Sequence, residues 1–308
     1  MSETVSNLPL WRSLLYVPVN VEKYVDKAHT RGADCIQLDL EDSVPDGEKE
    51  RARSLVQAAA GRVRRGGADV IVRINRPLSL AVRDIEASVS ESVSGLAITK
   101  VASAEHIQLL DELVSEVEAA RGLPLGHTRF VAMIETPAAF FRMPAIAASS
   151  SRLVGMNIGG EDLATEVGME PTEETLLMPK QQMILAARSA GLMPLGFIAS
   201  VAGFDDWDAF RAMVGRSRQF GFTGASCIHP GQVRIVNEEY SPSRAEIVRA
   251  TRIVDEAAAA EASGRSSFAI DGTMIDVPIV RRARQLLERH AAIQAREANA
   301  SRWMKQDG

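Results

Sequence analysis

Short apolar and β-branched runs alternate along the chain with longer segments whose apolar residues recur every three or four positions. The short runs read SLLYVPV (13–19), CIQLDLE (35–41), VIVRIN (70–75), GLAITKV (95–101), FVAMIE (130–135), LVGMNIG (153–159), MPLGFIA (193–199) and GASCIHP (224–230). Such near-continuous apolar runs are typical of strands covered on both faces in a parallel sheet. The segments between them predict amphipathic helices, as in EHIQLLDELVSEVEAARG (105–122).

Eight strands, each followed by a helix, predict an α/β fold of the (β/α)8 TIM-barrel type over residues 1–240. An open doubly wound sheet is the competing architecture. It usually carries a glycine-rich phosphate loop after the first strand, and none stands there. The pattern therefore favours the barrel.

A different pattern begins after residue 240 and predicts a C-terminal helical extension over residues 241–308. SPSRAEIVRATRIVDEAAAAEASG (241–264) has Ser/Pro capping chemistry followed by one Ala-rich amphipathic helix. The break GRSSF (264–268) precedes a last helix that we expect to begin near Ile279. This extension is too short for a core of its own, so we expect it to pack on the barrel or on a neighbouring subunit.

Composition narrows the class of protein. The 308 residues are 46% hydrophobic and 24% charged, with a formal net charge of −5, as in ordinary globular proteins and unlike most nucleic-acid binders. No apolar stretch approaches the ~18 residues of a membrane span, and no signal peptide is visible. Cys35 and Cys227 lie far apart in apolar runs, which predicts buried thiols and a cytoplasmic location.

In a barrel of this type, functional side chains gather at the carboxyl ends of the strands. The polar residues at these ends are Asp39, Glu41, Asp42, Arg73, Asn75, Lys100, Glu135, Glu161 and Asp162. Several carboxylates without His or Cys ligand spacing suit a hard cation such as Mg²⁺, and we predict Glu135 and Asp162 as its direct ligands. The alternative for either one alone is a carboxylate that stabilises a helix N-terminus.

Arg73 alternates with Val72 and Ile74, so its side chain should face the barrel interior or mouth. A guanidinium there could bind an anionic substrate through two hydrogen bonds, or form a structural ion pair with Asp39 or Glu41. Those two acids and Asp42 could equally hold metal-bound waters. His229, at the end of the last strand, is expected to be structural.

Seven segments, in this order, resemble the CoA-ester lyases related to the citrate lyase β subunit, within the HpcH/HpaI aldolase superfamily. They are RSLLYVPVNVEKYVDKA (12–28), ADCIQLDLEDSVPDGEKERAR (33–53), VRIN (72–75), MIETPAA (133–139), GGEDLATEVG (159–168), GFTGASCIHPGQVRIVNEEYSPS (221–243) and DGTMIDVPIVRRAR (271–284). The resemblance covers nearly the whole chain.

The resemblance implies Mg²⁺, with Mn²⁺ as the alternative ion, held by Glu135 and Asp162, and an acyl portion bound by Arg73 and Glu135. It implies that Tyr16, Pro18, Asn20 and Lys23 lie near the CoA chain and phosphates. It also implies that Asp276 is an acid–base group on a C-terminal lid, commonly that of the adjacent subunit in a homotrimer or hexamer. GRSSF could be the hinge of that lid.

The expected activity is carbon–carbon bond cleavage of a 3-hydroxyacyl-CoA, of the citramalyl-CoA or malyl-CoA type, to acetyl-CoA and a 2-oxo acid. Four alternatives stay open. They are a malyl-CoA-type thioesterase, a CoA-independent aldolase of 2-oxo acids, the citryl-carrier lyase subunit of a citrate lyase complex, and a non-catalytic acyl-CoA-binding barrel. The N-cap of the last helix is the alternative role of Asp276.

Overall fold

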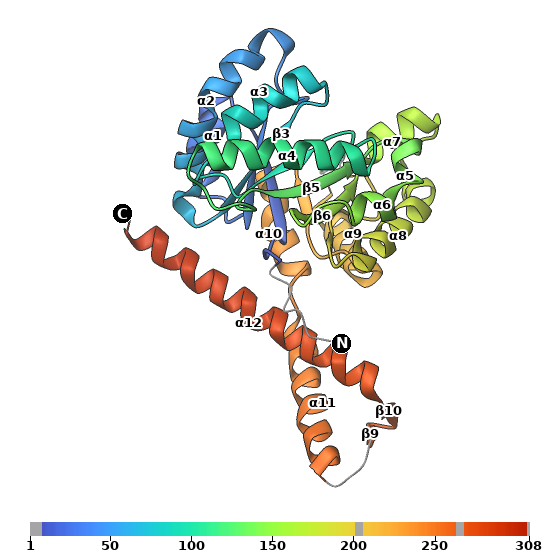
Figure 1. The fold of residues 1–308 in the computed structure, drawn as a ribbon. Coiled ribbons are helices and arrows are strands. Elements are labelled where there is room, and N and C mark those ends of the chain that lie inside the picture. Colours follow the sequence, from blue (N-terminus) through green and yellow to red (C-terminus); the bar gives the residue numbers. More distant parts are fainter. Residues whose placement is uncertain (1–7, 201–205, 263–267, 307–308) are drawn as a thin grey trace. The chain divides into compact units, whose positions relative to one another are not determined.

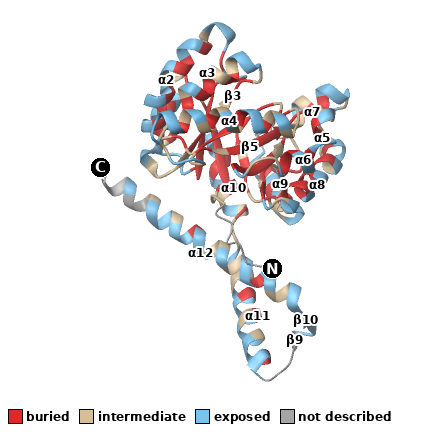
Figure 2. Ribbon diagram, in the orientation of Figure 1, coloured by how far each residue is buried: buried red, intermediate tan, exposed pale blue. Residues whose placement is uncertain are grey.

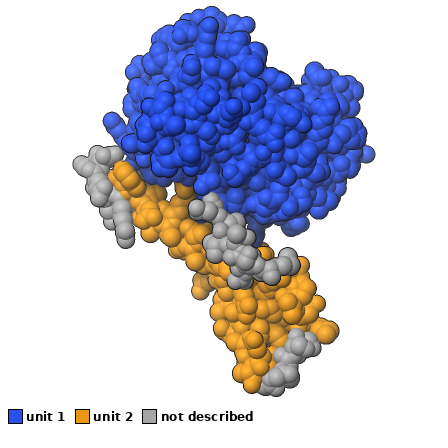
Figure 3. All heavy atoms as spheres, in the orientation of Figure 1, with its two compact units in different colours: residues 1–240, 307 blue, residues 241–306, 308 orange. Residues whose placement is uncertain are grey.

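The computed structural model describes residues 8–200, 206–262 and 268–306. The chain divides into two compact units, one ending at Tyr240 and the other beginning at Ser241 (Figure 3). The first unit contains one sheet of parallel strands in the order β7-β6-β5-β4-β3-β2-β1-β8 (Figure 1). The strands are β1 (Ser13–Pro18), β2 (Cys35–Asp39), β3 (Asp69–Ile74), β4 (Gly95–Ile98), β5 (Arg129–Ile134), β6 (Leu153–Ile158), β7 (Met193–Pro194) and β8 (Ala225–Cys227).

Backbone hydrogen bonds join the two outer strands of this sheet. Leu195, directly after β7, forms a parallel bridge with Gly224, directly before β8. The amide of Gly196 donates to the carbonyl of Gly224 at 2.8 Å, and the amide of Thr223 donates to the carbonyl of Pro194 at 3.0 Å. The sheet therefore closes on itself, which confirms the predicted (β/α)8 barrel and makes the open-sheet alternative wrong.

Helices follow the strands and cover the outside of the sheet (Figure 1). They are α1 (Glu22–Ala28), α2 (Lys49–Val63), α3 (Leu78–Ser88), α4 (Ala104–Ala120), α5 (Pro137–Phe140), α6 (Met143–Ala147), α7 (Gly160–Val167), α8 (Glu173–Ser189), α9 (Trp207–Phe220) and α10 (Pro230–Glu239), with 3-10 turns at Asp46–Glu48 and Arg64–Gly66. In α4 the side chain of Ser103 accepts a hydrogen bond from the amide of His106, and this cap explains where the predicted helix begins.

The core has two layers, because successive side chains of a strand point to opposite faces. Ile36, Leu38 and Val72 belong to the large cluster between strands and helices, whereas Cys35 and Ile71 belong to a cluster inside the barrel. Figure 2 shows the buried residues concentrated in the strands and on the inner sides of the helices. Burying each Val, Leu or Ile side chain contributes about 1.5–3 kcal/mol. The same alternation turns the side chains at the strand ends inward.

The second unit is a pair of helices with a β-hairpin between them: α11 (Arg244–Ala262), β9 (Phe268–Ile270), β10 (Thr273–Ile275) and α12 (Val277–Gln306). The antiparallel hairpin pairs Thr273 with Ile270. Its turn is Asp271–Gly272, both with positive φ (48° and 75°), as a two-residue turn of this kind requires. The proposed hinge at residues 264–267 lies outside the described residues, so the lid remains a prediction.

None of the helices in the described part of the chain combines the length and the hydropathy needed to cross a membrane. Cys35 and Cys227 are both buried, as the sequence predicts.

Candidate active site

The carboxyl ends of β2 to β6 bring the predicted polar residues together at one mouth of the barrel. Asp39 is the last residue of β2, Arg73 is near the end of β3, and Glu135 follows β5 directly. Asp162 lies in the first turn of α7, which follows β6. The placement predicted from strand ends therefore holds for each of these side chains.

Arg73 is surrounded by carboxylates on the inner face of the barrel. Its Nε and one terminal nitrogen donate to the two oxygens of Asp39, each at 2.7 Å. Its other terminal nitrogen lies 2.9 Å from Glu41 and 3.3 Å from Asp42. The guanidinium also lies 4.8 Å from the ring centre of Tyr16. The ion-pair alternative raised for Arg73 is therefore present, with both Asp39 and Glu41.

These contacts determine the protonation states of Asp39, Arg73 and Tyr16. Burial alone would raise the pKa of Asp39, but the hydrogen bonds and charge of Arg73 hold it below its usual value. Burial alone would lower the pKa of Arg73, and Asp39, Tyr16 and Glu41 together raise it instead. Burial raises the pKa of Tyr16 to about 12, so its phenol stays neutral. The Asp39–Arg73 pair is thus a fixed ion pair in the wall of the site.

Lys100 lies close to three carboxylates at the mouth of the barrel, those of Glu41, Asp162 and Glu135. Its Nζ donates to Glu41 at 2.8 Å and lies 3.8 Å from Asp162, while its backbone amide donates to Glu135 at 2.5 Å. Lys100 has a φ of 46°, a left-handed conformation that is uncommon outside glycine. The amide that donates to Glu135 thus belongs to a residue with a left-handed backbone conformation. The position of Lys100 at a strand end predicts that it lies at the mouth of the barrel. Nothing in the sequence predicts the hydrogen bond of its amide or its backbone conformation.

Glu135 is only 2% exposed. Burial, with repulsion from Asp162 and Glu41, raises its pKa to about 7 despite the hydrogen bond from Lys100. The helix-capping alternative does not hold for Glu135, because Thr136 caps α5. Gly159 allows the close packing, since a Cβ atom there would lie 2.5 Å from Cγ of Glu135.

The charge of this cluster fits a divalent cation. Among the described residues, Asp39, Glu41, Asp42, Glu135 and Asp162 outnumber the cations near them, which are Arg73, Lys100 and, in the lining of the smaller cavity, Lys180. Within the described ranges, no group of three or more His, Cys, Asp or Glu side chains is arranged to hold a metal. Two carboxylates with open positions for water or substrate are a common Mg²⁺ arrangement. Glu135 and Asp162 are the pair that would hold the ion.

Two cavities meet at this mouth. The smaller, about 210 Å³, is lined by Glu135, Asp162 and Lys180 among others, and the larger is about 800 Å³. Tyr16, Arg73 and Ile228 line both. A ligand could therefore place one end against the metal-ligand pair and extend past Tyr16 into the larger cavity.

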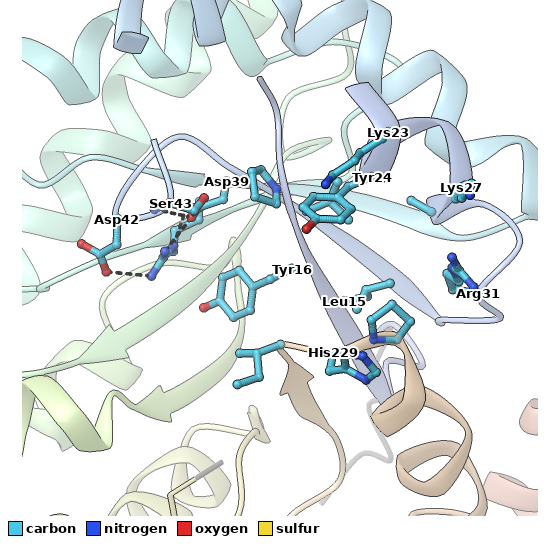
Figure 4. Close-up of a pocket in the computed structure, with 16 residues that line it drawn as sticks. Leu15, Tyr16, Lys23, Tyr24, Lys27, Arg31, Asp39, Asp42, Ser43 and His229 are labelled. Atoms are coloured by element: carbon cyan, nitrogen blue, oxygen red, sulfur yellow. Dashed lines mark hydrogen bonds and ion pairs between the residues drawn. The ribbon is translucent and has the colours of Figure 1, made fainter. Parts of the chain in front are cut away.

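The larger cavity has a basic side and an acidic side (Figure 4). Lys23, Lys27 and Arg31 recur every four residues from α1 into the following turn, and all three line this cavity. Asp39 and Asp42 line the opposite side, with Tyr16 between the two groups in Figure 4. A ligand with phosphate groups suits the basic side.

The other predicted residues, Pro18, Asn20, His229 and Asp276, have different surroundings in the structure. Pro18 lines the larger cavity, whereas Asn20 lines neither cavity, and its buried Oδ1 has no partner among the described residues. His229 lines the larger cavity, and its Nδ1 accepts a hydrogen bond from the amide of Gly231 at the start of α10, a structural role. Asp276 belongs to the second unit, where its Oδ1 accepts from the amide of Ile279 at 3.4 Å, which is its N-cap alternative.

Comparison with known proteins gives consistent matches. The family model described as HpcH/HpaI aldolase/citrate lyase matches residues 12–230. The citrate lyase subunit beta of Leuconostoc mesenteroides subsp. cremoris is 31% identical, over 92% of this chain and 94% of the relative. A (3S)-malyl-CoA thioesterase of Cereibacter sphaeroides is 34% identical, over 94% of this chain and 98% of the relative.

A solved structure is similar over most of its length. It is CitE from Mycobacterium tuberculosis in complex with magnesium, acetoacetate and coenzyme A, with a TM-score of 0.72 and 27% identity. The match covers 91% of this chain and 97% of the solved chain.

Proposed function

Because the chain belongs to the HpcH/HpaI aldolase/citrate lyase family, we propose that it is a Mg²⁺-dependent lyase of a 3-hydroxyacyl-CoA. The products are acetyl-CoA and a 2-oxo acid, and the substrate is of the citramalyl-CoA or malyl-CoA type. The two activities in the family's name both break a carbon–carbon bond, which confirms the enzyme class predicted from the sequence.

The observation that carries this proposal is the junction of the two cavities at Tyr16 and Arg73. On one side lie Glu135 and Asp162, which suit a metal and a small oxygen-rich acyl group. On the other side Lys23, Lys27 and Arg31 suit the phosphates of a CoA chain. A CoA ester of a short hydroxy acid has both chemistries, in that order. The magnesium and coenzyme A in the related CitE complex support the same assignment.

Cleavage requires charge to be stabilised at two places. The hydroxyl on carbon 3 of the acyl chain loses its proton and becomes a carbonyl. The electron pair of the broken bond passes to carbon 2, which then takes up a proton to become the acetyl methyl group. Glu135 and Asp162 would hold the Mg²⁺ ion, which when bound would supply a Lewis acid that stabilises the negative charge developing on the hydroxyl oxygen.

Arg73 contributes a fixed positive charge on the wall that both cavities share. Its position is held by Asp39, so little reorganisation is needed when charge develops in the substrate. Loss of one such stabilising contact typically lowers the rate by about 100- to 1000-fold.

Proton delivery to carbon 2 is assigned to Asp276, and this part of the proposal depends on the resemblance alone. Asp276 is exposed at the N-terminus of α12. Its donation to a neighbouring subunit's site agrees with a homotrimer or hexamer. Size-exclusion chromatography that gives a clean monomer would contradict donation between subunits.

The test is a coupled assay of the purified chain with citramalyl-CoA and malyl-CoA, with Mg²⁺ and then with EDTA, in which mass spectrometry identifies both products. Metal-dependent formation of acetyl-CoA with pyruvate or glyoxylate is expected. Free CoA with an intact hydroxy acid would instead favour the thioesterase, the activity named for the Cereibacter relative. Turnover without CoA would favour the aldolase, and co-purification with partner subunits would favour the citrate lyase complex.

A further inference from the structure

Lys180 is a buried lysine whose side chain reaches the small cavity. It lies inside α8, directly after Pro179, and is only 5% exposed. It lines the cavity that contains Glu135 and Asp162. Its Nζ donates to the backbone carbonyl of Ala199 at 2.9 Å.

The ammonium group of Lys180 lacks a counter-ion among the described residues. An ammonium has three donors, and one hydrogen bond, to Ala199, is recorded for it within the described ranges. No carboxylate of those residues makes an ion pair with it, although Glu161 acts on it from farther away. Burial lowers the pKa of Lys180 to about 8, with Glu161 opposing that shift, so the group is still mostly charged at neutral pH. A buried charge that a more distant carboxylate balances only in part is costly, which favours a functional role.

The two other cations at the mouth differ in this respect. Arg73 makes ion pairs with Asp39 and Glu41, and Lys100 makes one with Glu41. Their charges are therefore already balanced by the protein. Of the two cations that line the small cavity in the described chain, Lys180 is the one without a carboxylate at ion-pair distance, so an anionic ligand can add to the partial balance that Glu161 provides.

The surroundings of Lys180 suit a carboxylate. Gly160, the first residue of α7, brings its backbone close, since a Cβ atom there would lie 3.7 Å from the Nζ. No side chain caps the N-terminus of α7, so its backbone amides add partial positive charge at the same place, which Glu161 and Asp162 in the same first turn oppose. Asn157 also lines the cavity, and its buried Oδ1, which has no hydrogen-bond partner within the described ranges, is an acceptor that suits the hydroxyl of the substrate and not its carboxylate.

We propose that Lys180 binds the carboxylate of the 2-oxo-acid half of the substrate, the half that leaves without CoA. This inference rests on the proposed lyase function and adds to it a substrate-binding residue. The carboxylate accepts hydrogen bonds from the free donors of the ammonium, while the donor to Ala199 keeps the side chain in place. Lys180 thereby selects acyl groups that carry an anion next to the hydroxyl carbon.

The test compares Lys180→Met with the wild type in the full-length, Mg²⁺-loaded protein. In the condensation direction, the KM for pyruvate or glyoxylate should rise about 10- to 100-fold, as for loss of one hydrogen bond to a charged group. The KM for acetyl-CoA should stay within about twofold, because the basic residues of the larger cavity are untouched. Lys180→Arg should recover most of the affinity for the 2-oxo acid, since it restores the charge.

A binding measurement makes the inference independent of turnover. Pyruvate should raise the thermal unfolding midpoint of the wild type in a concentration-dependent way. The Met variant should need at least about 10-fold more pyruvate for the same rise. Gln182→Met, at an exposed position of the same helix, is the matched control and should respond like the wild type. If the Met variant does not fold, Lys180→Gln serves, because it keeps a donor for Ala199 but has no charge.

Three results would overturn the inference: an unchanged response to pyruvate in the Met and Gln variants, no response of the wild type, or an equal loss of Mg²⁺ and pyruvate affinity. The last would mean that Lys180 only positions the loop after β7. Failure of the lyase proposal has a different signature. In that case the wild type turns over neither CoA ester, yet its pyruvate binding still depends on Lys180.

Discussion

Replacing Gly159 by Ala should disturb the proposed metal-ligand pair, Glu135 and Asp162, without replacing either residue. Gly159 precedes α7 at the end of β6, with an ordinary φ of −73°, so alanine introduces no backbone strain. The added Cβ would lie 2.5 Å from Cγ and 2.7 Å from Oε1 of Glu135. Non-bonded carbon atoms prefer about 3.5–4.0 Å, so the carboxylate must retreat by about 1 Å.

The cost follows from what holds Glu135 in place. The side chain is buried, and its Oε2 accepts the hydrogen bond from the amide of Lys100. A strained rotamer costs about 0.5–1.5 kcal/mol, and a lost hydrogen bond to a charged group costs about 1.5–3 kcal/mol. Together these predict Mg²⁺ binding weaker by about 30- to 2000-fold. A 1 Å displacement can also lower the rate about 100-fold.

Calorimetric titration with Mg²⁺ and the coupled lyase assay measure these two effects. Gly160→Ala is the neighbouring control, because its Cβ would meet Leu176 at 3.1 Å and not Glu135. A flexible leucine can move by a few tenths of an ångström, so this variant should bind Mg²⁺ normally. If Gly159→Ala binds Mg²⁺ as tightly as the wild type, the assignment of Glu135 as a ligand in this conformation is wrong.

The remaining predictions concern a buried acid of α4, an exposed glycine of α2 and the proposed proton donor. Burial alone would raise the pKa of Glu118, but hydrogen bonds from Arg152 and two backbone amides hold that pKa below 4.5. Ionised Glu118 therefore stabilises the folded state fully above pH 4.5, and this stabilisation is lost as the pH falls through the lower pKa of the folded state. The thermal unfolding midpoint should thus fall more steeply with decreasing pH for the wild type than for Glu118→Gln. Gly61→Ala, with nothing within 4 Å of the new Cβ, should raise the free energy of unfolding by about 0.5–1 kcal/mol in a denaturant titration. Asp276→Ala should leave folding and Mg²⁺ affinity unchanged but abolish turnover, and near-normal turnover would remove its proposed role.

The barrel could be predicted from the sequence because each strand is an apolar run between polar segments. The ends of the strands were less predictable. The run 193–199 has only Met193–Pro194 in β7, since Gly196 has a φ of 133° and the chain leaves the strand geometry there. The hairpin β9–β10 was missed, although Asp271–Gly272 is the strongest short signal for such a turn. Its strands are too short to stand out by alternation.

The site was predictable where strand position alone fixes a side chain, as for Arg73, Glu135 and Asp162. It was not predictable where the contact depends on backbone conformation or helix packing. The amide of Lys100 that donates to Glu135 belongs to a residue with a positive φ, which the sequence does not predict for a lysine. Lys180 comes from the middle of α8, far from any strand end, and reaches the cavity because α8 packs against the loop after β7. Neither arrangement leaves a motif in the sequence.

Charge balance decides what each cation at the mouth can do. Arg73 has the geometry of an anion-binding residue, but Asp39, Glu41 and Asp42 already surround it. An anionic acyl group entering a metal-free site would therefore meet more negative than positive charge. A divalent cation at Glu135 and Asp162 would offset most of that excess, because it adds two positive charges beside the small cavity. We therefore expect the metal to bind before the acyl group, with Arg73 acting on the substrate only once the carboxylates around it are shared with the metal and its waters.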